Sequence, residues 1–234
     1  VIDTQKEGDV YIHQVIGVNS RLSIGSKLVL KVNEKRRINI KNNHTATHLL
    51  HESLKMVLGD HVKQKGSLVS DKKLRFDFTN NSPLKYEQID EIEKIINSVI
   101  RNNLIVVTDL MDYKIAIEGG AIALFGEKYP SKVRVVTIQD ERKDSSFLSK
   151  ELCCGTHVEN TGEIGSIKIM NESSVSSGVR RIEAVTGEEL DKLNREQSRL
   201  LGELKNILKT SESNIITKIK NIIIENHLLK KKNI

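Results

Sequence analysis

Apolar and polar residues alternate in short runs over residues 1–40, as in DVYIHQVIG and SKLVLKVN. A period of two residues is typical of strands that bury one face. Asn19-Ser20 and Gly25-Ser26 separate the runs and are residues that favour turns. Residues 1–40 are therefore predicted to form β-hairpins that belong to a partial β-barrel.

The next segment changes to a helical period. The stretch NHTATHLLHESLKMVLG, from Asn43 to Gly59, repeats apolar residues every three to four positions, as an amphipathic helix does. Asn43 suits the N-cap position, and Gly59 suits the position that follows a helix end. We therefore expect a helix from His44 to Leu58.

Strand signals follow this helix and are interrupted by one further long helix. GSLVSDKKLRFDF is typical of a hairpin that turns at residues 70–72, and Ser82-Pro83 is the usual opening of a helix. Strands are predicted in LIVVTDL, VRVVTIQ, GSIKIM and VRRIEAVT, with the Gly-containing stretch IEGGAIALFGEKYP among them. Residues 41–186 are therefore expected to form an α+β domain with a mixed or antiparallel sheet and packed helices.

The pattern becomes purely helical after Gly187. EELDKLNREQSRLLGELKNILK and ITKIKNIIIENHLLKKK carry helical periodicity without strand signals, and residues 211–213 offer a break between them. Residues 187–234 are predicted to be a helical tail. A linker, a coiled-coil arm and a docking helix all remain open for it, because the heptad run is short.

Composition narrows the class of protein. With 234 residues the chain can form one large domain or two small ones, and 38% apolar and 29% charged residues indicate a globular protein. Aromatic residues make up only 3%, so Ile, Leu and Val must fill the core. The net charge of +6 indicates either a solvated Lys-rich surface or a polyanionic partner such as a nucleic acid.

The two cysteines, Cys153 and Cys154, are adjacent and therefore do not form a disulfide framework, which fits a reducing cytoplasm. No apolar run approaches the roughly 20 residues of a membrane span, so no membrane partner is expected. The sequence begins with Val1 rather than Met. We expect it to be a fragment of a longer protein.

Three histidines lie close together in the first predicted helix. At about 100° per residue, His44 and His48 share one helical face, and His51 falls on the same stripe. Leu50 and Leu54 form a neighbouring apolar stripe that would seat the helix on the core. Two histidines at this spacing can clamp a metal, but such a pair is more often an ordinary surface or core feature.

The stretch ELCCGTH supplies a second pair, Cys153 and His157, again four residues apart, with Gly155 allowing an unusual turn. A thiolate and an imidazole are a typical zinc pair. Two such pairs in a chain with only 7 His and 2 Cys predict one tetrahedral zinc site. Its ligands are His44, His48, Cys153 and His157.

Simpler interpretations of these residues stay open. Cys153 could be a small buried apolar residue, and His157 a hydrogen-bonded polar one. Cys154 could replace Cys153 as the sulfur ligand. His51 is the spare imidazole, and we expect it to stack or to form hydrogen bonds.

Several long motifs resemble the editing domain of bacterial alanyl-tRNA synthetases. They are NHTATHLLHESLKMVLGDHVKQKGSLVSDKKLRFDF, GGAIALFGEKYPSKVRVV and ELCCGTHVENTGEIGSIKIMNESSVSSGVRRIEAVTG. The resemblance covers roughly Asp9 to Gly187. It implies that residues 1–40 are the end of a β-barrel linker and that the tail leads to a C-terminal domain. The family usually has Gly-Gly after the motif cysteine, and Cys154 replaces the first glycine here.

The resemblance implies hydrolysis of serine or glycine esters wrongly attached to tRNA(Ala), with the tRNA acceptor end as partner. Ligation of alanine, with ATP and Mg²⁺, would belong to an upstream domain that this sequence lacks. Two alternatives remain, a zinc-stabilised tRNA-binding module without catalysis and a free-standing trans-editing protein. Bound zinc would either activate a water or position the substrate, and four protein ligands favour positioning.

An editing site must recognise the hydroxyl group that serine has and alanine lacks, because an apolar pocket rejects it only about a hundredfold. Thr45, Thr47 and Gln64 are the candidates for this recognition. Gln64 lines the editing pocket by resemblance, and the hydroxyl of Thr47 either faces the pocket or bonds its own helix. Basic residues around the predicted hairpin and after the SSVSSG stretch are expected to hold RNA phosphates. They are Lys65, Lys73, Arg75, Arg180 and Arg181, and a solvated charged face is the simpler interpretation of each.

Overall fold

The computed structural model describes residues 1–17, 23–123, 128–142 and 147–232, without the side chains of the last two of these residues. The turn expected at Asn19-Ser20 and the centre of the Gly-containing stretch, residues 124–127, lie outside the described residues. The chain divides into two compact units, Val1–Asn33 and Glu34–Ile234. Each unit is described by itself.

The first unit contains one antiparallel hairpin, formed by β1 (Asp3–Glu7) and β2 (Val10–Gln14). The expected strand in SKLVLKVN is wrong, because residues 27–33 have no regular secondary structure. Alternation of apolar and polar residues is not sufficient for a strand. A strand also needs a neighbouring strand to pair with and a surface on which its apolar face is buried. Leu28, Val29 and Leu30 remain exposed. The barrel itself stays a prediction.

The second unit opens with α1 (Glu34–Leu58), which begins earlier than His44. The preceding residues EKRRINIKNN contain no Gly or Pro to stop a helix, so the helix extends through them. Asn43 is therefore inside the helix and not its cap. Its amide donates to the carbonyl oxygen of Ser70 at 2.9 Å, and its Oδ1 accepts from the Thr186 hydroxyl at 2.7 Å. Gly59 follows the helix end with φ +106°, as expected.

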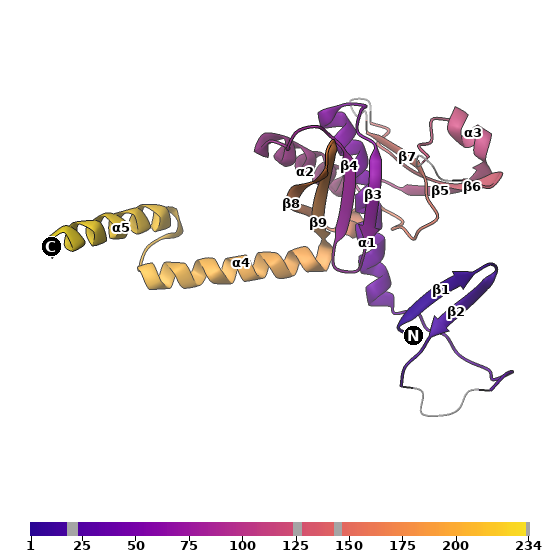
Figure 1. The fold of residues 1–234 in the computed structure, drawn as a ribbon, viewed down its shortest axis with the longest axis horizontal. Coiled ribbons are helices and arrows are strands. Elements are labelled where there is room, and N and C mark those ends of the chain that lie inside the picture. The colour runs from indigo at the N-terminus through magenta and orange to yellow at the C-terminus, as the bar shows by residue number, and fades with distance from the viewer. Residues whose placement is uncertain (18–22, 124–127, 143–146, 233–234) are drawn as a thin grey trace. The chain divides into compact units, whose positions relative to one another are not determined.

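A four-stranded antiparallel sheet covers one side of α1 (Figure 1). Its strands, in spatial order, are β3 (Gln64–Val69), β4 (Leu74–Thr79), β9 (Val179–Thr186) and β8 (Ile167–Ser176). The hairpin between β3 and β4 turns where the sequence predicts it. There the Ser70 hydroxyl accepts hydrogen bonds from the backbone amides of Lys72 and Lys73.

The second helix, α2 (Tyr86–Arg101), packs against α1 and β8. It begins after the predicted Ser82-Pro83 start, because Leu84 inserts into the core and the chain stays extended through Lys85. The Lys85 amide donates to Gln88 Oε1 at 2.9 Å and closes the helix start. The core between helices and sheet consists of fully buried side chains. They include Leu49, Leu50, Leu54, Phe76, Phe78, Ile92, Ile96 and Ile182.

A second antiparallel sheet has the strand order β5-β6-β7, and its β7 contacts α1. The strands are β5 (Val106–Asp112), β6 (Lys132–Gln139) and β7 (Leu148–Leu152), with the short helix α3 (Tyr113–Glu118) after β5. The 3₁₀ turn η1 (Thr161–Ile164) precedes β8. The sequence did not indicate β7, because the run Ser149-Lys150-Glu151 is polar although Ser149 and Glu151 are buried.

The described residues after Thr186 are largely helical, as predicted. They comprise α4 (Gly187–Leu208), the 3₁₀ turn η2 (Glu212–Asn214) and α5 (Ile215–Lys232). Together these elements confirm the α+β class with antiparallel sheets and packed helices. Among the described residues, no helix combines the length and apolarity needed to cross a membrane.

Replacing Leu50 by Ala should lower the free energy of unfolding by about 2 to 5 kcal/mol, because it leaves a cavity between α1 and the sheet. Urea denaturation followed by circular dichroism measures this change. Leu200→Ala, at an exposed position of α4, is the matched control and should change stability by less than about 0.5 kcal/mol. Equal losses for both variants would contradict the assigned core.

Candidate metal centre

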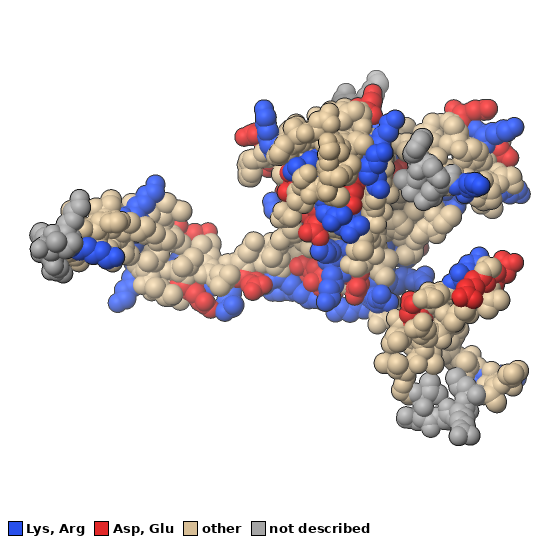
Figure 2. Space-filling model, in the orientation of Figure 1, with Lys and Arg blue, Asp and Glu red and all other residues tan. Residues whose placement is uncertain are grey.

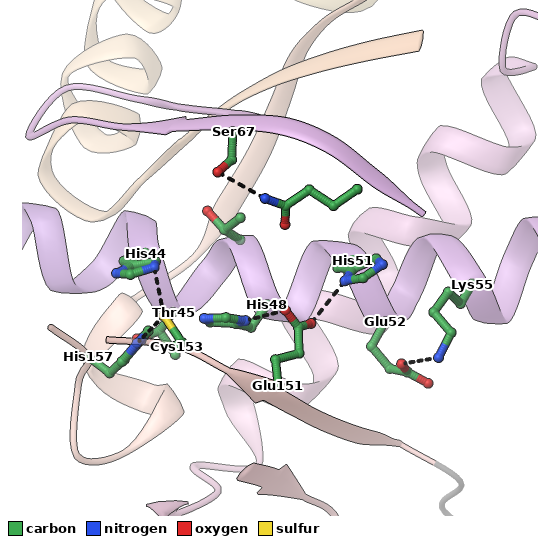
Figure 3. Close-up of polar contacts among 12 residues, drawn as sticks. His44, Thr45, His48, His51, Glu52, Lys55, Ser67, Glu151, Cys153 and His157 are labelled. Carbon is green, nitrogen blue, oxygen red and sulfur yellow. Dashed lines mark hydrogen bonds and ion pairs between the residues drawn. The ribbon is translucent and has the colours of Figure 1, made fainter. Parts of the chain in front are cut away.

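Four predicted ligands from two distant segments meet at one point. His44 and His48 lie on α1, and Cys153 and His157 lie in the loop after β7, with their ligand atoms all within 4.8 Å of one another. Cys153 Sγ is 3.3 Å from His44 Nε2, 109 residues away, and 3.3 Å from His157 Nε2 (Figure 3). Donors about 2.0 to 2.3 Å from one tetrahedral ion would stand roughly 3.5 Å apart, so these side chains could hold a metal.

The environment of the cluster fits a cation. His48 is buried, and its Nε2 has no hydrogen-bond partner in the part of the chain that the structure describes. A buried imidazole nitrogen without a partner costs free energy, and coordination would remove that cost. Three imidazoles and one thiol are a donor set compatible with zinc.

Cys153 is prepared as a thiolate. Burial alone raises the pKa of its thiol, but hydrogen bonds with His157 and His44 outweigh burial and lower the pKa to about 3. The thiolate is the form of cysteine that binds metals. Cys154 is exposed and is not a member of the cluster.

Glu151 connects the cluster to the next histidine along α1. Its Oε2 lies 2.9 Å from His48 Nδ1, and its Oε1 lies 3.0 Å from His51 Nδ1 (Figure 3). Burial raises the pKa of this carboxyl, but the opposing effect of His48 and His51 is larger. The net result is a pKa below the usual range of a carboxyl group. A carboxylate on the rear nitrogen of a ligand histidine fixes the ring and leaves the other nitrogen free for the metal.

His48 shows the complementary shift. Burial lowers its pKa, but the charge of Glu151 raises it to about 10. The site therefore favours positive charge at the imidazole, and a bound cation would supply that charge in place of a proton. His157 has its pKa lowered to about 4, chiefly by burial, so its ring is neutral and able to coordinate at neutral pH.

The loop that carries Cys153 is held by side chains of neighbouring elements. Arg134 on β6 donates from Nη1 to the carbonyl oxygens of Cys153, at 3.1 Å, and of Gly155. A Cβ atom at Gly155 would lie 1.9 Å from His44 Cε1, so only glycine lets the His44 ring take its place. The Thr45 hydroxyl accepts from the Val158 amide at 3.1 Å and joins the loop to α1.

His51 has the role expected of the spare imidazole. It hydrogen-bonds Glu151 and packs its ring 5.2 Å from that of Phe76. It also lines a cavity of about 370 Å³ together with Lys55, Lys63 and Gln64. Its buried Nε2 has no hydrogen-bond partner among the described residues.

The three candidates for hydroxyl recognition are placed differently. Gln64 lines the cavity beside His51, and its amide donates to the Ser67 hydroxyl at 3.2 Å. The buried Thr47 hydroxyl donates to the carbonyl oxygen of Asn43 at 2.8 Å, within its own helix. Thr45 is buried between α1 and the loop of His157.

The five basic candidates lie on β3, β4 and β9 and in the turn between β3 and β4. Lys65 is exposed on β3, and Lys73 forms an ion pair with Glu183. The Arg181 guanidinium binds both carboxylate oxygens of Asp77, at 2.7 and 2.8 Å. Arg75 lies 3.7 Å from the same carboxylate, and Arg180 is paired with Glu172.

Sequence reasoning gave no role to Glu151 or Arg134. Glu151 is two residues before Cys153, and alternate residues of a strand share a face, so the strand period could have indicated a carboxylate beside the ligand. Nothing in the sequence marks Arg134, whose function depends on the loop folding over β6.

Replacing Cys153 by Ala should remove the bound metal, whereas Cys154→Ala should keep it, because only the first thiol reaches the cluster. Inductively coupled plasma mass spectrometry of each purified variant measures how much metal it retains. Equal metal loss, or loss in the Cys154 variant alone, would overturn the ligand assignment.

Glu151→Gln should weaken metal binding by about 10- to 100-fold, because the amide no longer fixes His48 as a carboxylate does. Competition with a chromogenic chelator measures the affinity. Glu159→Gln changes an exposed carboxylate in the same loop and should leave the affinity unaltered. Unchanged affinity in the Glu151 variant would show that this carboxylate does not support the site.

Comparison with known proteins finds one family model and several relatives that match the chain. Residues 133–183 match the family model described as "Threonyl and Alanyl tRNA synthetase second additional domain". The chain is 45% identical over 222 residues to an alanine--tRNA ligase of Pseudothermotoga lettingae, and 46% identical over 232 residues to one of Rickettsia prowazekii. These alignments cover 95% and 99% of the chain but only 25% and 26% of the relatives. The chain is therefore a homologue of one segment of the alanine--tRNA ligases, about a quarter of their length.

Proposed function

We propose that this chain is the editing domain of an alanyl-tRNA synthetase and hydrolyses serine and glycine esters of tRNA(Ala). The observation that carries the proposal is the four-ligand cluster joined through Glu151 to the cavity that Gln64 lines. The family model and the two relatives support the same assignment. Residues 41–186, with the rest of α1, would hold the activity in the cytoplasm, between the end of a β-barrel linker and a helical tail.

The metal that fits the site is zinc, held by His44, His48, Cys153 and His157. When bound there it supplies a fixed positive charge beside the ester, which either positions the aminoacyl group or lowers the pKa of a water. Four protein ligands favour positioning. Glu151 and Arg134 keep the ligands in place by bonding His48 and the loop backbone.

Recognition of serine depends on its hydroxyl group. Gln64 lines the cavity, and its side-chain amide, which also donates to the Ser67 hydroxyl, can hydrogen-bond the hydroxyl of serine, a contact that alanine cannot make. Thr45 and Thr47 remain candidates for the same role, and both hydroxyls, like the Gln64 amide, already bond the protein. Hydrolysis adds water to the ester carbonyl carbon and breaks its bond to the ribose oxygen, which leaves with a proton. Free serine and deacylated tRNA result.

The predicted RNA contacts and the ligation of alanine concern the larger protein. Contacts of Lys65, Lys73, Arg75, Arg180 and Arg181 with RNA would lie along β3, β4 and β9 and at the turn between β3 and β4. Ligation of alanine with ATP and Mg²⁺ would belong to the parts of the relatives that this chain does not match.

The chain should release serine and glycine from tRNA(Ala) and leave alanine attached, which a deacylation assay with radiolabelled amino acids measures. Gln64→Ala should lower kcat/KM for Ser-tRNA(Ala) by about 10- to 100-fold, the value of one hydrogen bond in the transition state. Gln197→Ala, exposed on α4, is the matched control. Binding of tRNA without any release of serine would instead favour a tRNA-binding module without catalysis.

A further inference from the structure

One polar stripe runs the length of α1 and places the metal cluster between two cavities. Seven residues of an α-helix fall only about 20° short of two full turns, so positions seven apart share a face. Figure 3 shows His44, His48, His51 and Lys55 following one another in this way. Two basic residues nearer the helix start continue the series. The α1 stripe is Arg37, Lys41, His44, His48, His51 and Lys55.

The two ends of the α1 stripe face different cavities. His51 and Lys55 line the cavity that contains Gln64. Arg37 and Lys41 line a second, open cavity of about 580 Å³, whose wall includes the cluster residue His157. The metal cluster therefore separates a cavity with an amide group from a cavity with two cations.

Arg37 and Lys41 differ from the basic residues predicted from the sequence. No ion pair or hydrogen bond of either side chain occurs among the described residues, whereas Lys73, Arg75 and Arg181 are each close to a carboxylate. A cation that already faces a carboxylate has less to gain from a phosphate. In space-filling view, Lys and Arg gather over the part of the molecule where α1 begins (Figure 2).

The remaining wall of this cavity suits an anion. Arg134 contributes a guanidinium that already bonds the backbone of the cluster loop. Glu159 is the one carboxylate of the described lining, and its side chain is exposed. Thr108, Thr156 and Asn160 add neutral polar side chains, and the rest of the wall is apolar. The local charge is therefore positive beside the metal.

The geometry of an aminoacyl nucleotide matches this order of groups. The ester and the nearest phosphate are attached to opposite ends of one ribose, at its 3′ and 5′ oxygens, so a phosphate must lie one sugar away from the ester. At 1.5 Å per residue, Arg37 lies about 10 Å and Lys41 about 5 Å along α1 from the cluster residue His44. A strand with its ester at the metal can therefore reach both cations with its phosphate.

We propose that Arg37 and Lys41 form a phosphate-binding site that holds the RNA strand leading to the ester, on the side of the metal cluster opposite Gln64. This inference rests on the proposed hydrolysis and assigns the direction in which the RNA enters. Arg37 and Lys41 bind substrate and take no part in the bond that is broken.

The test compares substrates with and without phosphate. The variant Arg37→Gln/Lys41→Gln should raise KM for Ser-tRNA(Ala) on the order of tenfold, with kcat nearly unchanged. Hydrolysis of 3′-O-seryl-adenosine, which has no phosphate, should be the same as for wild type. Metal content should also be unchanged, because neither residue touches the cluster.

A second measurement does not depend on catalysis. The slope of log K against log salt for binding of uncharged tRNA(Ala) should fall by about 1 to 2 in magnitude in the double variant, since two phosphate contacts are lost. Arg101→Gln/Lys114→Gln removes one exposed Arg and one exposed Lys from α2 and α3 and is the matched control. It should leave the slope and KM as in wild type.

The outcomes separate the two proposals. Equal effects of both double variants on KM and on the slope would overturn the phosphate site and leave the hydrolytic function standing. Loss of seryl-adenosine hydrolysis in the Arg37/Lys41 variant would also overturn it, because the residues would then act on the reaction itself. Absence of serine release by wild type would refute the hydrolytic function, and the salt slope would still decide whether Arg37 and Lys41 bind phosphate.

Discussion

The structure depends on bringing together two pairs of metal-binding side chains that are far apart in the sequence. The helix α1 carries one pair and the loop after β7 carries the other, and 109 residues separate His44 from Cys153. Grouping three imidazoles and a thiol in a buried place is unfavourable unless their polar atoms find partners. Glu151 provides such a partner for His48 and Thr45 one for His157, and a cation fits at the centre.

Much of this arrangement could be predicted from the sequence because its signals are local. The spacing of four residues in both ligand pairs is visible without a structure, and so are the β3-β4 hairpin, β8, β9 and the helical tail. The helix boundaries were less predictable. Asn43 has the chemistry of a cap, but the structure uses its amide to bond Ser70 and Thr186, which no local pattern can indicate.

The supporting residues were missed because their roles arise only from tertiary contacts. Glu151 belongs to a short polar strand without an apolar pattern, and its importance appears only when β7 lies against α1. The ion pairs of Arg180 and Arg181 likewise depend on strand register, since Asp77 lies directly opposite Arg181. The sequence marks these residues as basic but does not indicate which cations already have carboxylate partners.

Gly155 has a consequence for how such centres are recognised in other sequences. It offers no donor atom, yet any side chain there would occupy the space of the His44 ring. A search pattern restricted to three histidines and one cysteine would thus accept chains whose ligands cannot assemble. Requiring glycine two positions after the cysteine adds a purely steric filter. In a saturation library, the position of Gly155 would tolerate as little variation as the position of a metal ligand.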